Sequence, residues 1–215
     1  MELYLIRHAQ SQNNVKPEEQ RVEDPPLTEL GREQANCLAQ WIPTLKLTKL
    51  IVSPFLRTLQ TAEPIWKSTN LMPYVQTDLH ELGGCYCGHT PENITGRPGM
   101  NRAEIERQFP AFRISREIDG EGWWRSKPYE TRELARQRSK TLLKRTRDEY
   151  AQTDQSVAYV MHGDIKLLLL EQFHPDPLDT PCNVSVSKIL MTPQECRLQD
   201  YNRVQHLPPP LIARL

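Results

Sequence analysis

The sequence predicts an α/β protein, a three-layer α/β/α sandwich in which helices cover both faces of a mostly parallel, doubly wound sheet. Two observations support this prediction. Short apolar segments typical of buried strands alternate along the chain with longer segments typical of helices. Three of the apolar segments also end directly at polar residues, which is typical of strands that deliver side chains to a ligand site at the carboxyl edge of such a sheet.

Length and composition favour a single globular domain spanning residues 1–215. Hydrophobic residues make up 38% and charged residues 25% of the 215 residues, which is typical of a folded domain. No apolar run approaches the ~20 residues needed to cross a bilayer, and the N-terminus lacks the features of a secretory signal. We therefore expect a cytoplasmic protein with no membrane partner, whose five cysteines are reduced thiols.

The helix boundaries follow from capping residues. Thr28 is a good N-cap for one helix, and Ser53 with Pro54 favours the start of the next, which Pro64 is expected to end or kink. Polar stretches between these segments predict loops. The expected strands cover residues 2–6, 50–52, 74–76, 156–161, 184–191 and 196–204, and the expected helices cover 28–41, 53–66, 101–109, 130–150 and 165–173.

Residues 79–129 are expected to form an insertion, or lid, that covers the site. This segment begins as a Gly- and Pro-rich loop, in which Gly83 and Gly84 offer a hinge. Trp123 and Trp124 lie near its end. The sequence favours a buried aromatic anchor for this pair over a lid contact with substrate.

The formal net charge is zero, from 27 basic and 27 acidic residues, but the charges are unevenly distributed. Residues 97–147 hold 14 Lys and Arg against 7 Asp and Glu. A solvated, Arg-rich helical face is favoured over an anion-binding surface. The interleaved aromatic residues of a nucleic-acid stacking platform are missing, so no nucleic-acid partner is expected.

The residues at the predicted strand ends suit phosphate chemistry. Arg7 and Arg57 carry planar guanidinium groups that match phosphate oxygens in a bidentate manner. His8 in its neutral form is a competent nucleophile, and His162, if protonated, adds a donor to the same anion. The helix expected after Ser53 would add free amides and a positive dipole end. Phosphoryl transfer without a metal or organic cofactor follows from this set.

Four segments resemble the motifs of the histidine phosphatase superfamily, which includes the cofactor-dependent phosphoglycerate mutases. They occur in the family's order and are LIRHAQS at 5–11, PLTELG at 26–31, SPFLRTLQTA at 53–62 and VMHG at 160–163. The resemblance implies that His8 is the phosphate-accepting nucleophile and that Arg7, Arg57 and His162 form the phosphate pocket. It also implies that Glu81 is the proton donor, which requires a raised pKa beside the dianion.

Two further residues are candidates for phosphate binding. Asn14 matches the position of a pocket asparagine of the family, although it also suits a simple turn, and Ser11 offers a hydroxyl group. The chain departs from the family at Ala9, where a glycine is usual. Gly163 separates Asp164 from the second histidine, so Glu81 is preferred as the acid.

The residues that follow Glu81 lack the pattern usual in the mutases, which favours a phosphatase. The function expected is hydrolysis of a small phosphomonoester through a phosphohistidine. A phosphoglycerate mutase and a non-catalytic phosphate-binding module are the alternatives. The sequence identifies neither the substrate nor the oligomeric state; candidate flanking residues are Tyr86, Arg97, Arg102, Trp123 and Trp124.

Two thiols and two imidazoles between residues 80 and 89 raise the alternative of a metal site. They are His80, Cys85, Cys87 and His89. The Cys-x-Cys spacing is tighter than that of structural zinc sites, so a loop lining the site is favoured and no metal is expected.

Overall fold

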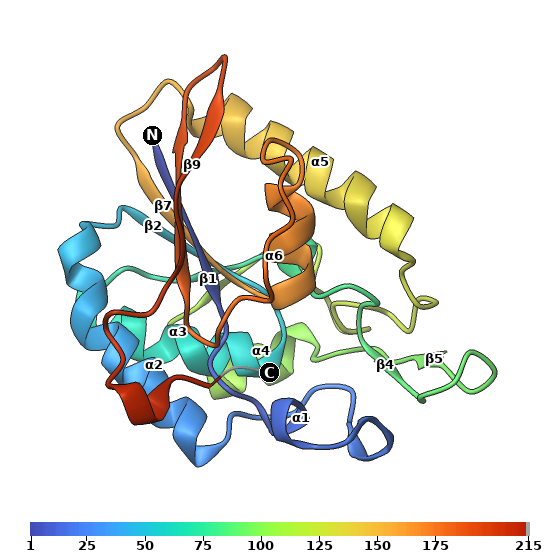
Figure 1. Ribbon diagram of the computed structural model, residues 1–215. Helices are drawn as coiled ribbons and strands as arrows, with labels where there is room; N and C mark the ends of the chain where they lie inside the picture. The colour runs from blue at the N-terminus through green and yellow to red at the C-terminus, as the bar shows by residue number, and fades with distance from the viewer. Residues whose placement is uncertain (214–215) are drawn as a thin grey trace.

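The computed structural model describes residues 1–213 and contains the predicted three-layer α/β architecture (Figure 1). Its central sheet has seven strands in the order β6-β3-β2-β7-β1-β8-β9. The first five of these pair in parallel, and the last two form an antiparallel edge. The strands are β1 (Glu2–Arg7), β2 (Lys49–Val52), β3 (Tyr74–Val75), β6 (Arg113–Ile114), β7 (Ser156–Met161), β8 (Val186–Met191) and β9 (Cys196–Arg203).

Helices cover both faces of the sheet because the buried strands are apolar on both sides. On β1, Tyr4 and Ile6 belong to one hydrophobic core, and Leu3 and Leu5 belong to the other. The first core is covered by α2 (Glu29–Trp41), α3 (Leu56–Thr69) and α4 (Arg102–Gln108), and the second by α5 (Arg132–Tyr150) and α6 (Gly163–Leu170). A short helix, α1 (Gln12–Val15), follows β1.

The start of α2 is as predicted and is tied to the loop after β1. The Thr28 side chain accepts a hydrogen bond from the Gly31 amide at 3.0 Å. A Cβ atom on Gly31 would lie 2.0 Å from the backbone oxygen of Gln10. Only glycine therefore allows the first turn of α2 to approach this loop so closely.

The prediction that the helix after β2 begins at Ser53 is wrong. Helix α3 begins at Leu56, three residues after Ser53, and its N-cap position is Phe55. The Leu56 amide donates to the Asp24 carboxylate at 2.9 Å, so a residue remote in sequence caps this helix. Pro64 does not end the helix either, because the burial of neighbouring apolar residues such as Ile65 outweighs the lost backbone hydrogen bond.

Residues 79–129, which were expected to form an inserted lid, contribute to three parts of the structure: the main sheet, the hydrophobic core and a separate hairpin. Strand β6 extends the main sheet beyond β3, and Ile105 and Phe109 lie in the core under α2 and α3. The hairpin consists of β4 (Tyr86–Cys87) and β5 (Thr95–Gly96), which extend away from the sheet in Figure 1. Among residues 1–213, no helix has the length and apolar character needed to cross a membrane.

Candidate active site

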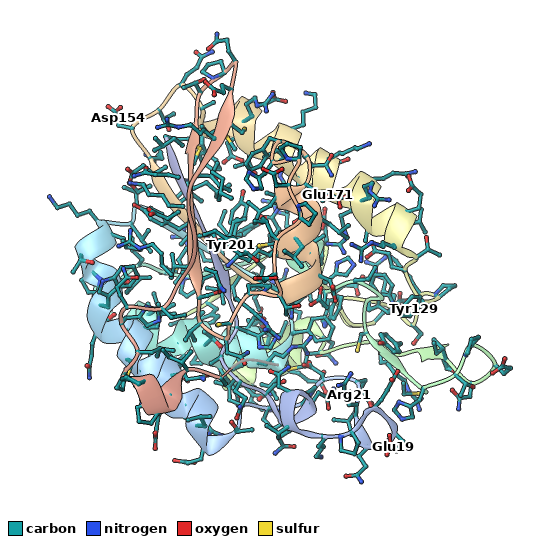
Figure 2. All side chains as sticks on the ribbon, in the orientation of Figure 1. Glu19, Arg21, Tyr129, Asp154, Glu171 and Tyr201 are labelled. Atoms are coloured by element: carbon teal, nitrogen blue, oxygen red, sulfur yellow. The ribbon has the colours of Figure 1, made fainter. Side chains whose placement is uncertain are left out.

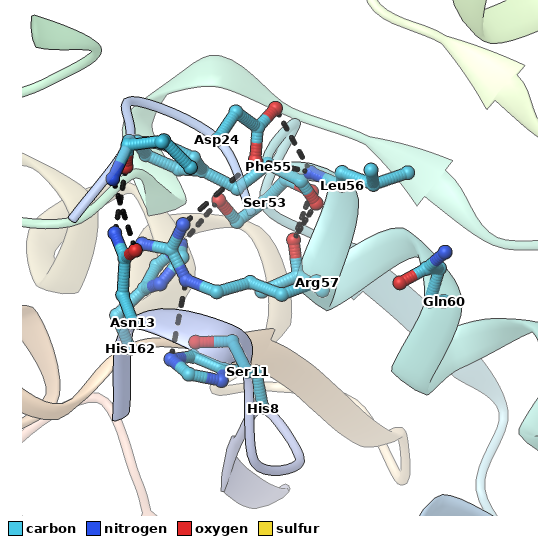
Figure 3. A network of polar contacts seen from close by, with 12 residues as sticks. His8, Ser11, Asn13, Asp24, Ser53, Phe55, Leu56, Arg57, Gln60 and His162 are labelled. Carbon is cyan, nitrogen blue, oxygen red and sulfur yellow. Dashed lines mark hydrogen bonds and ion pairs between the residues drawn. The ribbon is translucent and has the colours of Figure 1, made fainter. Parts of the chain in front are cut away.

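Three neighbouring strands bring the predicted site residues together. Strand β7 lies between β1 and β2 and is parallel to both, so the three carboxyl ends lie at one edge of the sheet. His8 follows β1, Ser53 follows β2 and His162 follows β7. The rings of the two histidines lie edge to face with their centroids 5.1 Å apart (Figure 3).

The hydrogen bonds of His8 fix which ring nitrogen is free to react. Nδ1 lies 2.7 Å from the Ala9 carbonyl oxygen, which can only accept, so Nδ1 carries the proton. Nε2 therefore has a lone pair, and the Nε–H group of Arg57 donates to it at 3.3 Å. Burial, reinforced by the charges of Arg57 and Arg7, holds the pKa of His8 well below its usual value. The imidazole is therefore neutral at neutral pH, with Nε2 as the nucleophilic atom.

Both predicted arginines are buried beside His8. Arg7 donates through Nη1 to the Pro181 carbonyl, while its buried Nε has no partner among the described residues. The Arg57 guanidinium lies 4.1 Å from the centroid of the Phe55 ring. Burial lowers the pKa of both arginines, but each remains charged. Two buried cations with spare N–H groups make this region attractive to an anion.

His162 is fully buried and is oriented by Ser53. The Ser53 hydroxyl lies 2.7 Å from Nε2 of His162, whereas Nδ1 has no partner within residues 1–213. If the hydroxyl donates to Nε2, Nδ1 carries the proton as an unpaired donor. Burial, with the charge of Arg57, lowers the pKa of His162 well below its usual value, so this donor is neutral. Ser53 thus contacts a site histidine instead of capping α3.

The Glu81 carboxylate lies at the N-terminus of α6. Oε1 accepts from the amides of Leu82 and Ile165 at 2.9 and 3.0 Å, and Oε2 accepts from the Asp164 amide at 3.2 Å. Burial raises the pKa of Glu81, the charge of Asp164 raises it further, and the amides oppose the shift. A carboxyl group with a raised pKa can carry the proton that a general acid needs.

Ser11 and Asn14 form a local capping box at α1. The Asn14 side-chain oxygen accepts from the Ser11 amide at 2.9 Å and from its hydroxyl at 3.3 Å. Asn183 donates to the same oxygen at 3.3 Å and to the His8 carbonyl at 3.0 Å. These contacts shape the loop that follows His8. Asn183 was not among the predicted site residues, because it lies 175 residues from His8 and in none of the four motifs.

A cleft of about 110 Å³ opens over Arg57 and Glu81. Its outer wall consists of the loop after α1, on which Figure 2 labels Arg21, and of the β4–β5 hairpin, including Tyr86. A larger groove of about 890 Å³ lies beside α5, but none of the five residues proposed for nucleophile, anion and acid chemistry lines it. Arg57 and Glu81 line the smaller cleft, and Arg57 contacts the buried His8, which does not itself line the cleft, so the smaller cleft is the candidate site.

Four of the five candidate flanking residues do not line the cleft. Arg97 donates to the Cys87 sulfur at 3.0 Å, and Arg102 donates to the Ser115 carbonyl at 2.7 Å. Trp123 and Trp124 are 3% and 7% exposed, in agreement with the predicted aromatic anchor. Trp123 packs edge to face on Phe55, with ring centroids 4.7 Å apart, and so supports the wall of the site from behind.

His80 and Cys85, two of the four residues suggested for a metal site, are buried. Nδ1 of His80 lies 2.7 Å from the Thr77 carbonyl, and burial raises the pKa of the Cys85 thiol to about 12. Within the described chain, no group of three or more His, Cys, Asp or Glu side chains is placed to hold a metal ion.

The fold and the site define a class of protein in which a neutral histidine lies beside two arginines at the carboxyl edge of a mostly parallel sheet. The chain belongs to the histidine phosphatase superfamily: the sequence profile of its branch 1 matches residues 3–204.

Among curated relatives, the probable phosphoglycerate mutase GpmB of Photorhabdus laumondii is 37% identical over 82 residues, and that of Cronobacter sakazakii matches equally. Each match covers 38% of this chain and only 38% of the relative. The solved structure of Bacillus stearothermophilus YhfR is similar, with a TM-score of 0.68, 22% identity and coverage of 95% of this chain and 98% of that one. A mycobacterial glucosyl-3-phosphoglycerate phosphatase in complex with VO3 has a TM-score of 0.62 at 22% identity, over 94% of this chain and 99% of that one. These structural similarities support the fold.

Proposed function

We propose that the protein is a metal-independent phosphatase that hydrolyses a small phosphomonoester through a phosphohistidine on His8. The observation that carries the proposal is the state of His8. Its proton is held on Nδ1 by the Ala9 carbonyl, and its unprotonated Nε2 accepts a hydrogen bond from the Arg57 guanidinium. Glu81, with its raised pKa, lines the same cleft as Arg57.

The first step is transfer of the phosphoryl group to the histidine. The Nε2 lone pair of His8 forms the N–P bond while the P–O bond to the leaving alcohol breaks. Glu81 gives its proton to the leaving oxygen. Arg7, Arg57 and the unpaired Nδ1 of His162 stabilise the charge on the three remaining phosphoryl oxygens.

The second step is hydrolysis of the phosphohistidine. Water attacks the phosphorus atom as the N–P bond breaks, and the Glu81 carboxylate takes up the proton that the water loses. Inorganic phosphate leaves, and both His8 and Glu81 return to their starting states. Ser11 and Asn14 act in this scheme by holding the loop after His8, through the capping box that they form.

Phosphoglycerate mutase activity is the second candidate, favoured by the GpmB relatives. It differs only in the acceptor, because the phosphohistidine returns its phosphate to a sugar acid instead of to water. The cleft holds one arginine besides Arg57, namely Arg21, which is exposed and shares the cleft with Glu18 and Glu23. This charge balance favours a substrate without a carboxylate and therefore favours hydrolysis.

The test is phosphate release from an aryl phosphate, several sugar phosphates and 3-phosphoglycerate, all in the presence of a chelator. Native protein is compared with His8→Ala and with His174→Ala, a matched control in which a histidine outside the site is removed. We expect release by the native protein and the control, and loss of at least ~10³-fold in His8→Ala. Release that persists in His8→Ala, or that is absent from the native protein with every ester, would contradict the proposal.

A further inference from the structure

We propose that Asp24 is a positioning residue that aims the Arg57 guanidinium at His8 and controls how strongly Arg57 holds an anion. This inference rests on the proposed function, because it concerns the same anion site. None of the four motifs includes Asp24, which lies in a polar stretch predicted to be a loop.

The Asp24 carboxylate has two contacts at the start of α3 (Figure 3). Its oxygens accept from the Leu56 amide at 2.9 and 3.2 Å, which fixes the carboxylate at the helix terminus. Oδ1 also lies 3.8 Å from Nη1 of Arg57, and the two side chains are only 12% and 11% exposed. One carboxylate therefore both caps the helix that carries Arg57 and contacts the guanidinium of that arginine.

Arg57 is held on three sides. Asp24 lies at Nη1, the Phe55 ring lies 4.1 Å from the guanidinium carbon, and Nε donates to His8 at 3.3 Å. An arginine side chain has several rotatable bonds, so an orientation this specific needs such contacts. Without Asp24, only the ring and the nucleophile itself would hold the guanidinium, and both must readjust when a phosphoryl group arrives.

The charge of Asp24 opposes anion binding. An ionised carboxylate beside Arg57 offsets the positive charge that a dianion would meet, whereas the protonated carboxyl does not. Burial and, to a smaller extent, the charge of Glu23 raise the pKa of Asp24, Arg57 and the Leu56 amide oppose the shift, and the resulting pKa is about 7. Cys85 also lies near this carboxyl, but its thiol is neutral because burial raises its pKa to about 12. The pair therefore changes its net charge near neutral pH.

The test uses sulfate as the probe, because it remains a dianion across the pH range and cannot be hydrolysed. Its dissociation constant is measured by calorimetry at pH 6 and pH 8 for native protein, Asp24→Asn and Glu19→Gln. Asparagine keeps an oxygen for the Leu56 amide and removes the charge. Glu19→Gln is the matched control, since it removes an exposed carboxylate of the same loop that does not line the cleft.

We expect Asp24→Asn to bind sulfate about as tightly as native protein at pH 6 and roughly five- to ten-fold more tightly at pH 8. Glu19→Gln should change the constant less than two-fold at either pH. Glu81 also ionises as the pH rises, but it does so in all three proteins and cancels in the comparison. Equal constants for native protein and Asp24→Asn at pH 8, or an equal effect of Glu19→Gln, would overturn the proposal.

Turnover of an aryl phosphate provides the second readout. In Asp24→Asn the Arg57 guanidinium is less firmly oriented toward His8, so kcat should fall. Its positive charge is no longer offset by a carboxylate, so KM should fall as well. A loss of the helix cap alone would instead lower thermal stability and raise KM, which would also overturn the proposal. Failure of the proposed function would look different: the native protein would release no phosphate, while its sulfate binding would still be measurable.

Discussion

Lys166 offers a test of how far burial controls charge around the site. It lies on α6 behind Arg7 and is fully buried, with Nζ 3.2 Å from the Ser185 carbonyl oxygen and 3.3 Å from its hydroxyl. The Tyr201 ring lies 5.9 Å from Nζ. Among these contacts there is no carboxylate. Burial accordingly lowers the pKa of Lys166 to about 7, and the charge of Arg7 adds to the effect.

The lowered pKa makes stability depend on pH with a defined sign. In the unfolded chain the lysine keeps its ordinary pKa of 10.5, so between about pH 7 and pH 10.5 the unfolded state binds more protons than the folded state. The free energy of unfolding therefore rises with pH in this window. From pH 7 to pH 9 the Lys166 contribution amounts to about 2 kcal/mol.

The substitution Lys166→Met removes this contribution and keeps most of the side-chain volume. Urea unfolding at pH 7 and pH 9 should show the native protein gaining about 2 kcal/mol relative to Lys166→Met. Lys140→Met, on the exposed face of α5, is the matched control and should follow the native protein. If the native protein and Lys166→Met show the same change with pH, the ammonium group is paired or hydrated in the folded state and the reasoning is refuted.

Three further predictions concern the site and its supports. The pH profile of kcat/KM should fall on the alkaline side as Glu81 ionises, and Glu81→Gln should lose that limb together with most activity. Arg138 donates to the carbonyls of Asp78 and His80 at 2.7 and 3.0 Å, directly before Glu81 in the sequence. Arg138→Gln should therefore lower kcat about ten-fold. An unchanged kcat would show that the loop carrying Glu81 keeps its position without Arg138. Gly31→Ala should lower the free energy of unfolding by roughly 2 kcal/mol or more in denaturant titrations, because its Cβ would meet a backbone oxygen at 2.0 Å.

Local signals predicted the elements and the strand-end residues well. The apolar pattern predicted the long central strands, and the motifs placed His8, Arg57 and His162 at or just after strand ends, which the structure brings to one edge of the parallel sheet. A strand of two residues, such as β6, is too short to show the alternation of apolar and polar residues that predicts a strand. The contribution of residues 79–129 to the main sheet was therefore not predicted.

Contacts between distant segments were beyond prediction. Ser53 has a strong local preference to cap a helix, yet its hydroxyl meets His162, 109 residues away. The cap of α3 comes instead from Asp24, and Asn183 supports the carbonyl of His8 from the far end of the chain. In each case a polar side chain forms a hydrogen bond with a buried polar group of a distant segment. Such a group needs a partner within the protein only after folding has removed it from water.

Burial acts on every ionisable group of the site in the same direction, toward the uncharged form, but its effect is unequal. It lowers the pKa of His8 and His162 well below the usual value, and it raises the pKa of Asp24 and of Glu81. Burial also lowers the pKa of Arg7 and of Arg57, but an arginine pKa starts so high that both side chains stay fully charged at neutral pH. The neighbouring carboxyl groups therefore offset the charges of the two arginines only in part, and an anion that binds beside them must stabilise the fold. With sulfate at about 100 times its dissociation constant, linkage requires roughly 2.7 kcal/mol of added stability, and the pH dependence of that gain would report the ionisation of the two carboxyl groups.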